Sequence, residues 1–372
     1  MHAFIVPPKI VTGPGCIGEL GTEASRLGRS AMLVIGCKSV ASAGGTDKLR
    51  GQLTAAGLTV EVFENVHPEP PCQDVDTLRQ RIKTHGSDVL VAVGGGSVMD
   101  IAKAAAILAF SDRPTAEHVA SQRLPDRSLP MIAAPTTAGT GSEATPTAVL
   151  TDKSIDRKKS IRHPELMMPK VAIVDPELML SCPPGVTAAS GADAFVQAVE
   201  SFCSKITTSL TDACSEKAIV LTARHLERAY RDGSDLEARQ AMAEGSLLAG
   251  MALANARLGV VHGLAHPIGG RFGVPHGLAC AVLLPYVLEY NRQVLEASGK
   301  YARLAGLLGT DPVRFASNLL KSLDLPSDFR TWPVDRSLIP ELAEEGMDSG
   351  STKANPRPAT RDDLAALLEK VL

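Results

Sequence analysis

The sequence predicts an α/β domain with a parallel sheet at residues 1–183, followed by an all-α domain at residues 184–372. From residue 31 onward, apolar runs of four to eight residues alternate with helical stretches, as is typical of a parallel sheet covered on both faces. The segment Cys182-Pro183-Pro184-Gly185 then interrupts this alternation. Beyond it no run is typical of a strand, and the chain is rich in Ala, Leu and Glu, which indicates helices.

The individual elements of the first domain follow from the same pattern. Residues 3–12 alternate loosely as an extended segment, and Pro7-Pro8 places it at an edge of the sheet or outside it. A glycine-rich turn precedes a helix at about 17–28. The further strands are expected at 31–36, 59–66, 88–97, 131–137 and 170–176, and the further helices near 46–57, 73–85 and 97–109.

Composition narrows the functional classes. The 372 residues include 44% hydrophobic and 21% charged residues, which is ordinary for a globular protein. A net charge of −3 with mixed signs and only 3% aromatic residues argue against nucleic acid or an acidic membrane as a partner. No apolar run reaches the length of a membrane span, and the N-terminus does not resemble a signal peptide. Seven scattered cysteines without a CxxC pair predict reduced thiols in a cytoplasm.

Residues 13–18 spell a GxGxxG pattern, which in some proteins binds a dinucleotide. The preceding segment contains prolines, and no acidic residue ends a strand about 20 residues later. We therefore interpret the pattern as the glycine-rich turn that opens the first helix.

A better candidate for anion binding is Gly94-Gly95-Gly96-Ser97, which directly follows one apolar strand and precedes a helix. Glycines let the backbone approach a phosphate closely, and the first turn of a helix offers free N–H groups. The spacing of Ser97 and Asp100 also allows a capping box, so this loop has a purely structural interpretation as well.

A second loop, Pro135–Glu143, also follows a predicted strand. Its hydroxyl groups, among them those of Thr136, Thr137 and Thr140, can donate hydrogen bonds to phosphates, ribose or an amide. The alternative is a simple turn.

Three of the nine histidines lie within fifteen residues of the second domain. His262 and His266 are four residues apart and would share one face of a helix, which Pro267 and Gly269-Gly270 then break or loosen. His276 lies in a turn before the next apolar segment. Such a cluster can bind a metal or transfer protons, whereas a single buried histidine is more often a hydrogen-bonded core residue.

Just after the predicted boundary, Asp193 and Gln197 are four residues apart on an expected helix, and Glu200 is roughly aligned with them. An isolated Asp is most often solvated or capping. Asp193 gains interest because it accompanies the histidines.

Several of these segments together carry a resemblance. They are GGGSVMDIAK at 94–103, PTTAGTGSE at 135–143, VAIVDPELM at 171–179, GADAFVQAVE at 191–200, HGLAHPIGGRFGVPHG at 262–277 and Asn355-Pro356-Arg357. In this order they resemble the signatures of the iron-containing (group III) alcohol dehydrogenase family. The resemblance implies a dehydroquinate synthase-like fold, with a dinucleotide-binding α/β domain, a helical domain and a divalent metal in the cleft between them.

The resemblance also implies site residues. The metal ligands would be Asp193, Gln197, His262 and His276, and His266 would be a catalytic residue beside substrate and nicotinamide. Family members have a histidine where this chain has Gln197. Because neutral imidazole is the better ligand, we expect Fe²⁺ or Zn²⁺ to bind more weakly here than in His-containing relatives. Stoichiometric, chelator-resistant metal would contradict that expectation.

The implied cofactor is NAD(P)(H), held by Gly94, Gly95, Gly96, Ser97, Asp100, Lys103, Thr136, Thr137, Thr140, Cys37, Lys38, Ser39 and Lys159. NAD-preferring members carry an Asp after the first Rossmann-type strand, whereas this chain has Cys37, Lys38 and Ser39 there. Without that carboxylate a 2′-phosphate is not repelled, so NADP is favoured slightly. Lys158 or Lys159 would lie near the nicotinamide ribose, and Glu69 stands where the family often has Asn.

The expected reaction is hydride transfer between nicotinamide C4 and a small alcohol or aldehyde, with metal assistance if the site is occupied. Three alternatives stay open: a metal-independent oxidoreductase resembling the maleylacetate reductases, a lyase resembling dehydroquinate synthase, and a nucleotide-binding protein that has lost catalysis at Gln197. The substrate itself is not fixed by the sequence. A homodimer or higher homo-oligomer is expected, since the extended N-terminal segment could pair across a twofold axis.

Overall fold

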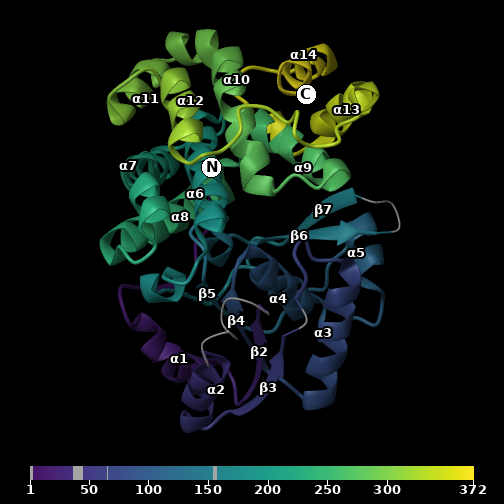
Figure 1. The fold of residues 1–372 in the computed structure, drawn as a ribbon. Coiled ribbons are helices and arrows are strands. Elements are labelled where there is room, and N and C mark those ends of the chain that lie inside the picture. Colours follow the sequence, from purple (N-terminus) through teal and green to yellow (C-terminus); the bar gives the residue numbers. More distant parts are fainter. Residues whose placement is uncertain (1–2, 37–44, 65, 154–156) are drawn as a thin grey trace. The chain divides into compact units, whose positions relative to one another are not determined.

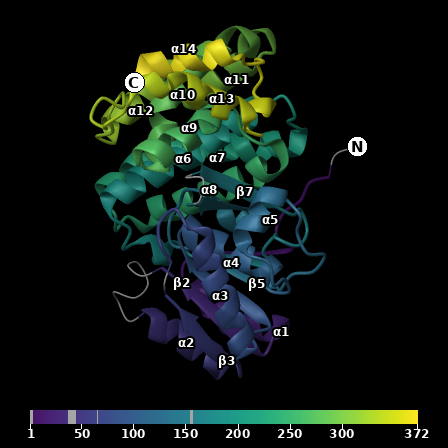
Figure 2. The ribbon, with the colours of Figure 1, turned by 90° about the vertical axis from the view of Figure 1, so that its right-hand side faces the viewer.

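The computed structural model describes residues 3–36, 45–64, 66–153 and 157–372, and these residues form two compact units. One unit spans Ile5–Cys182, and the other spans Pro183–Leu372 together with the N-terminal residues up to Phe4. Their elements are labelled in Figure 1, and Figure 2 shows the same ribbon from a second direction.

The unit Ile5–Cys182 contains most of the strands that the sequence predicts. In chain order its elements are β1 (Lys9–Thr12), η1 (Cys16–Glu19), α1 (Leu20–Leu27), β2 (Ser30–Ile35), α2 (Gly45–Ala55), β3 (Thr59–Phe63), α3 (Cys72–His85), β4 (Val89–Gly94), α4 (Gly96–Leu108), α5 (Thr115–Ser121), β5 (Met131–Pro135), η3 (Ser142–Ala144), β6 (Thr147–Asp152), β7 (Arg157–Arg162), β8 (Val171–Val174) and η4 (Pro176–Met179).

The main sheet is six-stranded and wholly parallel, in the order β1-β8-β5-β4-β2-β3. Side chains of a strand alternate between its two faces, and β2 shows this directly. Leu33 and Ile35 pack in a core with α1 and α2, whereas Met32 and Val34 pack in a second core with α3 and α4. Both faces are therefore covered, which explains why the strands are continuous apolar runs and confirms the predicted parallel sheet.

The order of the strands creates a switch point in the sheet. From β2 the chain moves outward to β3, whereas from β4 it moves in the opposite direction to β5 and β8. The helices that follow β2 and β4, α2 and α4, therefore cover opposite faces of the sheet. Ligands of open α/β sheets bind at such points, and the glycine loop at 94–97 lies at this one.

Two features of this unit were not predicted. Helix α5 follows α4, and β6 and β7 form a separate antiparallel hairpin with Thr147 opposite Arg162. The N-terminal segment, by contrast, contributes β1 at the edge of the main sheet, where β8 is its one neighbour among the described strands, as the prolines at 7 and 8 predicted.

The unit Pro183–Leu372 is helical and contains no strand; every residue of this stretch is described. Its elements are α6 (Pro184–Cys203), α7 (Ser209–Arg231), α8 (Leu236–Ala256), α9 (Val260–Phe272), α10 (His276–Ala297), α11 (Lys300–Leu308), α12 (Pro312–Ser322), η5 (Arg336–Leu338), α13 (Ile339–Asp348), η6 (Thr352–Ala354) and α14 (Arg361–Val371).

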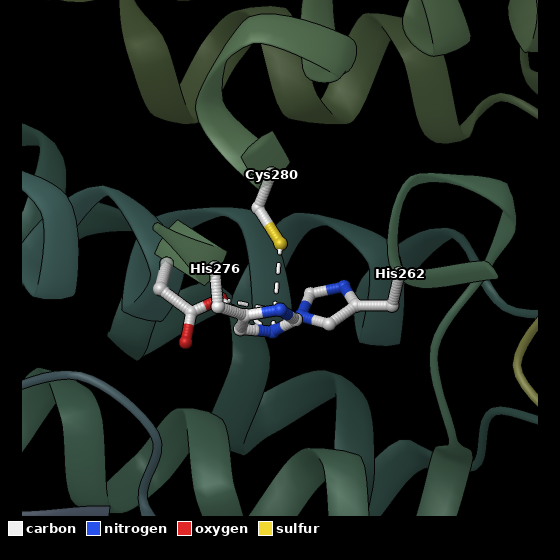
Figure 3. Close-up of side chains that lie close together, drawn as sticks. His262, His276 and Cys280 are labelled. Carbon is white, nitrogen blue, oxygen red and sulfur yellow. Dashed lines mark hydrogen bonds and ion pairs between the residues drawn. The ribbon is translucent and has the colours of Figure 1, made fainter. Parts of the chain in front are cut away.

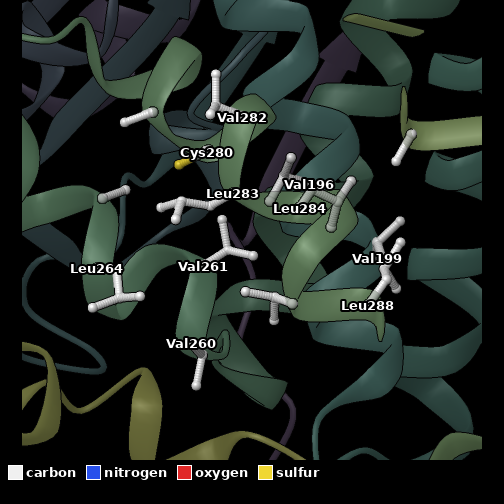
Figure 4. Packing of buried hydrophobic residues seen from close by; sticks show 14 of the residues in the cluster. Val196, Val199, Val260, Val261, Leu264, Cys280, Val282, Leu283, Leu284 and Leu288 are labelled. Carbon is white, nitrogen blue, oxygen red and sulfur yellow. The ribbon is translucent and has the colours of Figure 1, made fainter. Parts of the chain in front are cut away.

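The core of this unit forms where α6, α9 and α10 meet. Figure 4 shows part of it, with side chains of Val196 and Val199 from α6, Val260, Val261 and Leu264 from α9, and Cys280, Val282, Leu283, Leu284 and Leu288 from α10. These three helices also carry the polar residues singled out in the sequence.

The expectation that Pro267 and Gly269-Gly270 break the helix after His266 was wrong. Helix α9 continues through them to Phe272 and ends at Gly273, whose φ of 66° is left-handed. Proline removes one hydrogen bond, but Leu264 and Ile268 are fully buried in the core, and this packing offsets the loss.

In the described parts of the chain, no single helix is long and apolar enough to cross a membrane. The pair α8 and α9 would pass such a test together, by length and composition, but is bent by 104° at the break between them.

Candidate active site

Helices α9 and α10 bring the three imidazoles of the sequence cluster together. His262 and His266 are one turn apart on α9, and His276 is the first residue of α10. The rings of His266 and His276 stack with centroids 4.9 Å apart, and those of His262 and His276 lie 5.4 Å apart. The prediction that these three residues form one cluster is therefore confirmed.

Helix α6 adds the acidic side of the cluster. A Cβ at Gly277 would stand 2.1 Å from the carbonyl oxygen of Ala189, so only glycine allows α10 to approach α6 this closely. This close approach sets the Nε2 atom of His276 3.8 Å from Oδ1 of Asp193. The Nε2 atom of His262 lies 3.2 Å from the same oxygen.

A fourth donor that the sequence did not reveal completes the group. Asp193, His262, His276 and Cys280 each offer one ligand atom, and these atoms all lie within 4.8 Å of one another. Figure 3 shows the Cys280 thiol pointing towards the two imidazole rings, with its sulfur 3.7 Å from Nε2 of His276. The signal in the sequence is the spacing His276-x3-Cys280, which places both residues on one face of a helix.

Gln197 lies against Asp193. Its Nε2 donates a hydrogen bond of 2.8 Å to Oδ2 of Asp193, and the amide is buried. Its Oε1 is buried without a hydrogen-bond partner among the described residues. A buried acceptor without a donor costs about 1–3 kcal/mol of free energy.

Glu200 orients His262 from behind. Its Oε2 lies 2.7 Å from Nδ1 of His262 and its Oε1 accepts a hydrogen bond of 2.7 Å from the N–H of Val261. The carboxylate therefore occupies the positive N-terminus of α9 and directs Nε2 of His262 towards Asp193. A carboxylate on the far nitrogen of a histidine is the usual support of a metal-binding imidazole.

The charges of the cluster are strongly coupled. Burial acts to raise the pKa of Asp193, but His276 and the hydrogen bond from His262 outweigh it and lower the pKa to about 2. Burial acts to lower the pKa of His262, yet Cys280 and Asp193 hold that pKa well above its ordinary value. Burial raises the pKa of the Cys280 thiol to about 12.

These residues fit a divalent metal. One carboxylate, two imidazoles and a thiol are the donors that Zn²⁺ and Fe²⁺ take, and tetrahedral bonds of about 2.0–2.3 Å would separate the donors by about 3.3–3.8 Å. Three of the six distances between donor atoms are 3.2, 3.7 and 3.8 Å, within about 0.1 Å of that range, and all six are within 4.8 Å. His266 stacks beside this group and is not one of its four donors.

In the α/β unit, the loop at the switch point has room for an anion. A Cβ on Gly95 would have as its nearest neighbour Oγ1 of Thr137 at 3.6 Å, whereas one on Gly96 would meet Cγ2 of Thr140 at 2.8 Å. The space in front of Gly95 at the start of α4 is therefore open. The capping box that Ser97 and Asp100 allow does not form, because α4 has no side-chain cap.

Asp100 is engaged elsewhere. Its carboxylate accepts hydrogen bonds from Oγ of Ser142, at 2.7 Å, and from the N–H of Val149, at 2.9 Å. Lys103 is 1% exposed, and its ammonium donates to the carbonyl oxygens of Ser142, Thr145 and Thr147. Burial lowers the pKa of Lys103, which Asp100 partly counteracts. Both residues thus fasten the second loop to α4.

The second loop lies against the first. Thr136 is buried and its N–H donates to the carbonyl oxygen of Gly94, while Thr137 and Thr140 are partly exposed beside Gly95 and Gly96. The structure therefore brings the hydroxyl-bearing loop next to the glycine loop.

The remaining cofactor candidates lie on β7 or outside the described residues. Lys158 and Lys159 are neighbours on β7: Lys158 makes an ion pair with Glu69, whereas Lys159 is exposed. Cys37, Lys38 and Ser39 fall outside the described residues.

The GxGxxG pattern at 13–18 is a turn, as interpreted from the sequence. The carboxylate of Asp175 accepts hydrogen bonds from the N–H groups of Gly15 and Ile17. These are the donors that a phosphate would need, and a carboxylate in this place repels one.

Comparison with known proteins decides the family. A model of the iron-containing alcohol dehydrogenases matches residues 7–176, and a model of the family's C-terminal domain matches residues 187–372. The chain belongs to the iron-containing alcohol dehydrogenase family. It is thus an oxidoreductase that acts on CH–OH groups, and the matches cover both units.

Individual relatives of this iron-containing alcohol dehydrogenase are similar over the whole length. The NAD-dependent methanol dehydrogenase of Bacillus methanolicus is 33% identical, with 100% of both chains covered. Among solved structures, 1,3-propanediol oxidoreductase is 35% identical with a TM-score of 0.94 and 100% of both chains covered. Sulfoacetaldehyde reductase from Bifidobacterium kashiwanohense in complex with NAD⁺ is 30% identical with a TM-score of 0.91, covering 100% of this chain and 98% of that one.

Proposed function

We propose that this chain transfers hydride between C4 of NAD(P)(H) and a small alcohol or aldehyde, assisted by a divalent metal. The observation that carries the proposal is the group of buried Asp193 and His262 with partly exposed His276, whose donor atoms lie close together as metal ligands do. The relatives named for methanol, 1,3-propanediol and sulfoacetaldehyde share the reaction type and differ in substrate, so the reaction type is the firmer part of the proposal.

Asp193, His262 and His276 would hold the metal, with Gln197 as the sequence candidate for a fourth ligand. When bound, a divalent metal supplies positive charge that stabilises negative charge developing on the substrate oxygen. Glu200 keeps His262 in the required orientation and tautomer. His266 would orient the substrate or pass its proton outward, and its stacking on His276 supports this role.

The glycine loop and the second loop would bind the cofactor through Gly94, Gly95, Gly96, Ser97, Thr136, Thr137 and Thr140. Asp100 and Lys103 support this role by holding the second loop in place. Lys159 is the exposed lysine of β7 and is kept as a candidate for the nicotinamide ribose. We further propose that NADP is accepted and slightly favoured, since Cys37, Lys38 and Ser39 include no carboxylate to repel a 2′-phosphate.

The test is a panel of aldehydes and keto acids with the full chain, NADH or NADPH, and added Fe²⁺, Zn²⁺ or Mn²⁺. We expect aldehyde-dependent oxidation of both reduced cofactors, with kcat/KM for NADPH at least equal to that for NADH. Strict dependence on NADH would contradict the cofactor preference. No net consumption of either cofactor with any aldehyde would contradict the function and would favour a lyase.

Filling the space in front of Gly95 should weaken cofactor binding. The φ of −75° at Gly95 suits any residue, and a methyl group there meets no atom within 3.6 Å, so Gly95→Ala is expected to fold normally. It should raise the Kd for NADPH about tenfold or more by keeping phosphate from the α4 N-terminus. Fluorescence titration measures this, with Gly18→Ala, another glycine with open surroundings, as the matched control. Unchanged affinity in Gly95→Ala would move the phosphate site elsewhere.

We also propose a homo-oligomer in a reducing compartment such as the cytoplasm. Within the described part of the chain β1 is an edge strand beside β8, and its outer edge offers backbone groups for pairing across a twofold axis. The described cysteines are free thiols, which supports a reducing compartment.

A further inference from the structure

Cys280 meets the geometric requirements of a metal ligand. Its sulfur is one of four donor atoms within 4.8 Å of one another, and it is 3.7 Å from Nε2 of His276. Sulfur and nitrogen ligands of a tetrahedral Zn²⁺ ion lie about 3.5 Å apart. The side chain is fully buried, so the thiol faces the cluster and the core rather than solvent.

The helix geometry explains why Cys280 reaches the cluster. His276 and Cys280 are four residues apart on α10, as Asp193 and Gln197 are on α6. Two neighbouring helices therefore each present two side chains to one point, and α9 adds His262. This arrangement offers five polar side chains to a centre that needs four.

Gln197 differs from the other four because its amide nitrogen donates to Asp193. Its Nε2 donates to Oδ2 of Asp193, which leaves Oδ1 of that carboxylate facing both His262 and His276. An amide in this orientation fixes which carboxylate oxygen is free for the metal. It supports Asp193 as Glu200 supports His262.

We propose that Cys280, as the thiolate, is the fourth ligand of the metal and that Gln197 is a positioning residue for Asp193. This inference rests on the metal site of the proposed function. On binding, the sulfur–metal bond forms and the thiol proton leaves to solvent, so the bound set is two anions and two neutral imidazoles. Against Zn²⁺ this set is neutral overall, whereas one carboxylate with three neutral ligands leaves a charge of +1.

The thiolate changes both which metal the site prefers and how tightly the site binds that metal. Thiolate is a softer ligand than imidazole or an amide oxygen and selects Zn²⁺ over Fe²⁺. The weak binding expected from Gln197 alone is then offset by Cys280. Stoichiometric zinc in the purified protein would be the natural outcome of the proposal.

The test uses the full chain, stripped by chelator and reloaded with Zn²⁺ or with Co²⁺. X-ray absorption of the zinc-loaded wild type should show one sulfur at about 2.3 Å beside nitrogen and oxygen at about 2.0–2.1 Å. The cobalt-loaded wild type should show a sulfur-to-metal charge-transfer band in the near ultraviolet. Neither measurement depends on a variant or on activity.

Three variants complete the design. Cys280→Ala should lose the band and raise the Kd for Zn²⁺ by more than about 100-fold, since even supporting residues of a metal site are worth 10–100-fold. Gln197→Ala should keep the band and raise the Kd by about 10–100-fold. Cys203→Ala removes another buried thiol of the same core, at the end of α6, and should change neither.

The outcomes separate this inference from the proposed function. Metal bound without a sulfur neighbour, or a band that survives in Cys280→Ala, would overturn the role of Cys280 and leave the oxidoreductase intact. A wild type that binds neither ion would also overturn it, while aldehyde-dependent oxidation of NADPH in that same preparation would still support a metal-independent oxidoreductase. Absence of both metal and oxidation would remove the proposed function itself.

Discussion

Replacing Asp193 with asparagine is expected to lower kcat/KM for aldehyde reduction by about 1000-fold and to abolish stoichiometric metal binding. The carboxylate is the hub of the cluster, since Nε2 of both His262 and His276 face its Oδ1. A bound metal is worth several kcal/mol to the developing charge, and about 4 kcal/mol corresponds to about 1000-fold in rate. Steady-state kinetics and elemental analysis of the same preparation measure both effects.

Asp362→Asn is the matched control for this variant, because Asp362 is an exposed residue in the first turn of α14. It should retain full activity and metal content. If Asp193→Asn keeps more than a tenth of the wild-type kcat/KM, the metal-assisted mechanism is wrong and a metal-independent reductase becomes the better description.

Replacing His266 with alanine is expected to lower kcat by about 100-fold or more while leaving the metal content unchanged. The imidazole lies beside the donor group without belonging to it, and general acid–base groups contribute about 100- to 10,000-fold. The split between kcat and metal content is the informative readout. Loss of a metal ligand would lower both kcat and the metal content, whereas loss of a proton carrier would lower only kcat.

His225→Ala serves as the control, since His225 is partly exposed and lies on α7, whereas the three clustered histidines lie on α9 and α10. Turnover of His266→Ala equal to that of the wild type would remove His266 from the mechanism. Loss of metal in this variant would instead show that stacking on His276 holds that ligand in place.

The sequence predicted the main sheet well because its strands are buried on both faces and stand out as apolar runs. It did not predict the β6–β7 hairpin. Strand β6 alternates buried and partly buried residues, and β7 begins Arg157-Lys158-Lys159, which is typical of a solvated segment. The hairpin is stabilised by contacts far away in the chain, such as the N–H of Val149 bound to Asp100, and no local pattern records those.

Part of the candidate site could also be predicted from the sequence, because a regular spacing along a helix shows which residues share one face. Helical spacing places Asp193 over Gln197 and His262 below His266, and the clustering of His276 with them is confirmed. Cys280 was overlooked because it lies in an apolar stretch of α10, where a cysteine is indistinguishable from core packing until α6 is placed beside it.

Glu200 couples the stability of the first turn of α9 to metal binding at the proposed site. Oε2 of Glu200 lies 2.7 Å from Nδ1 of His262, and Oε1 accepts the N–H of Val261 in the first turn of α9, so any reorientation of that imidazole is transmitted to the start of the helix. A metal that binds only the closed conformation of this first turn of α9 would therefore make its local opening less frequent, by mass action. Amide hydrogen exchange at Val261 and His262 would accordingly track how many molecules in a preparation carry their ion, without a single turnover being measured.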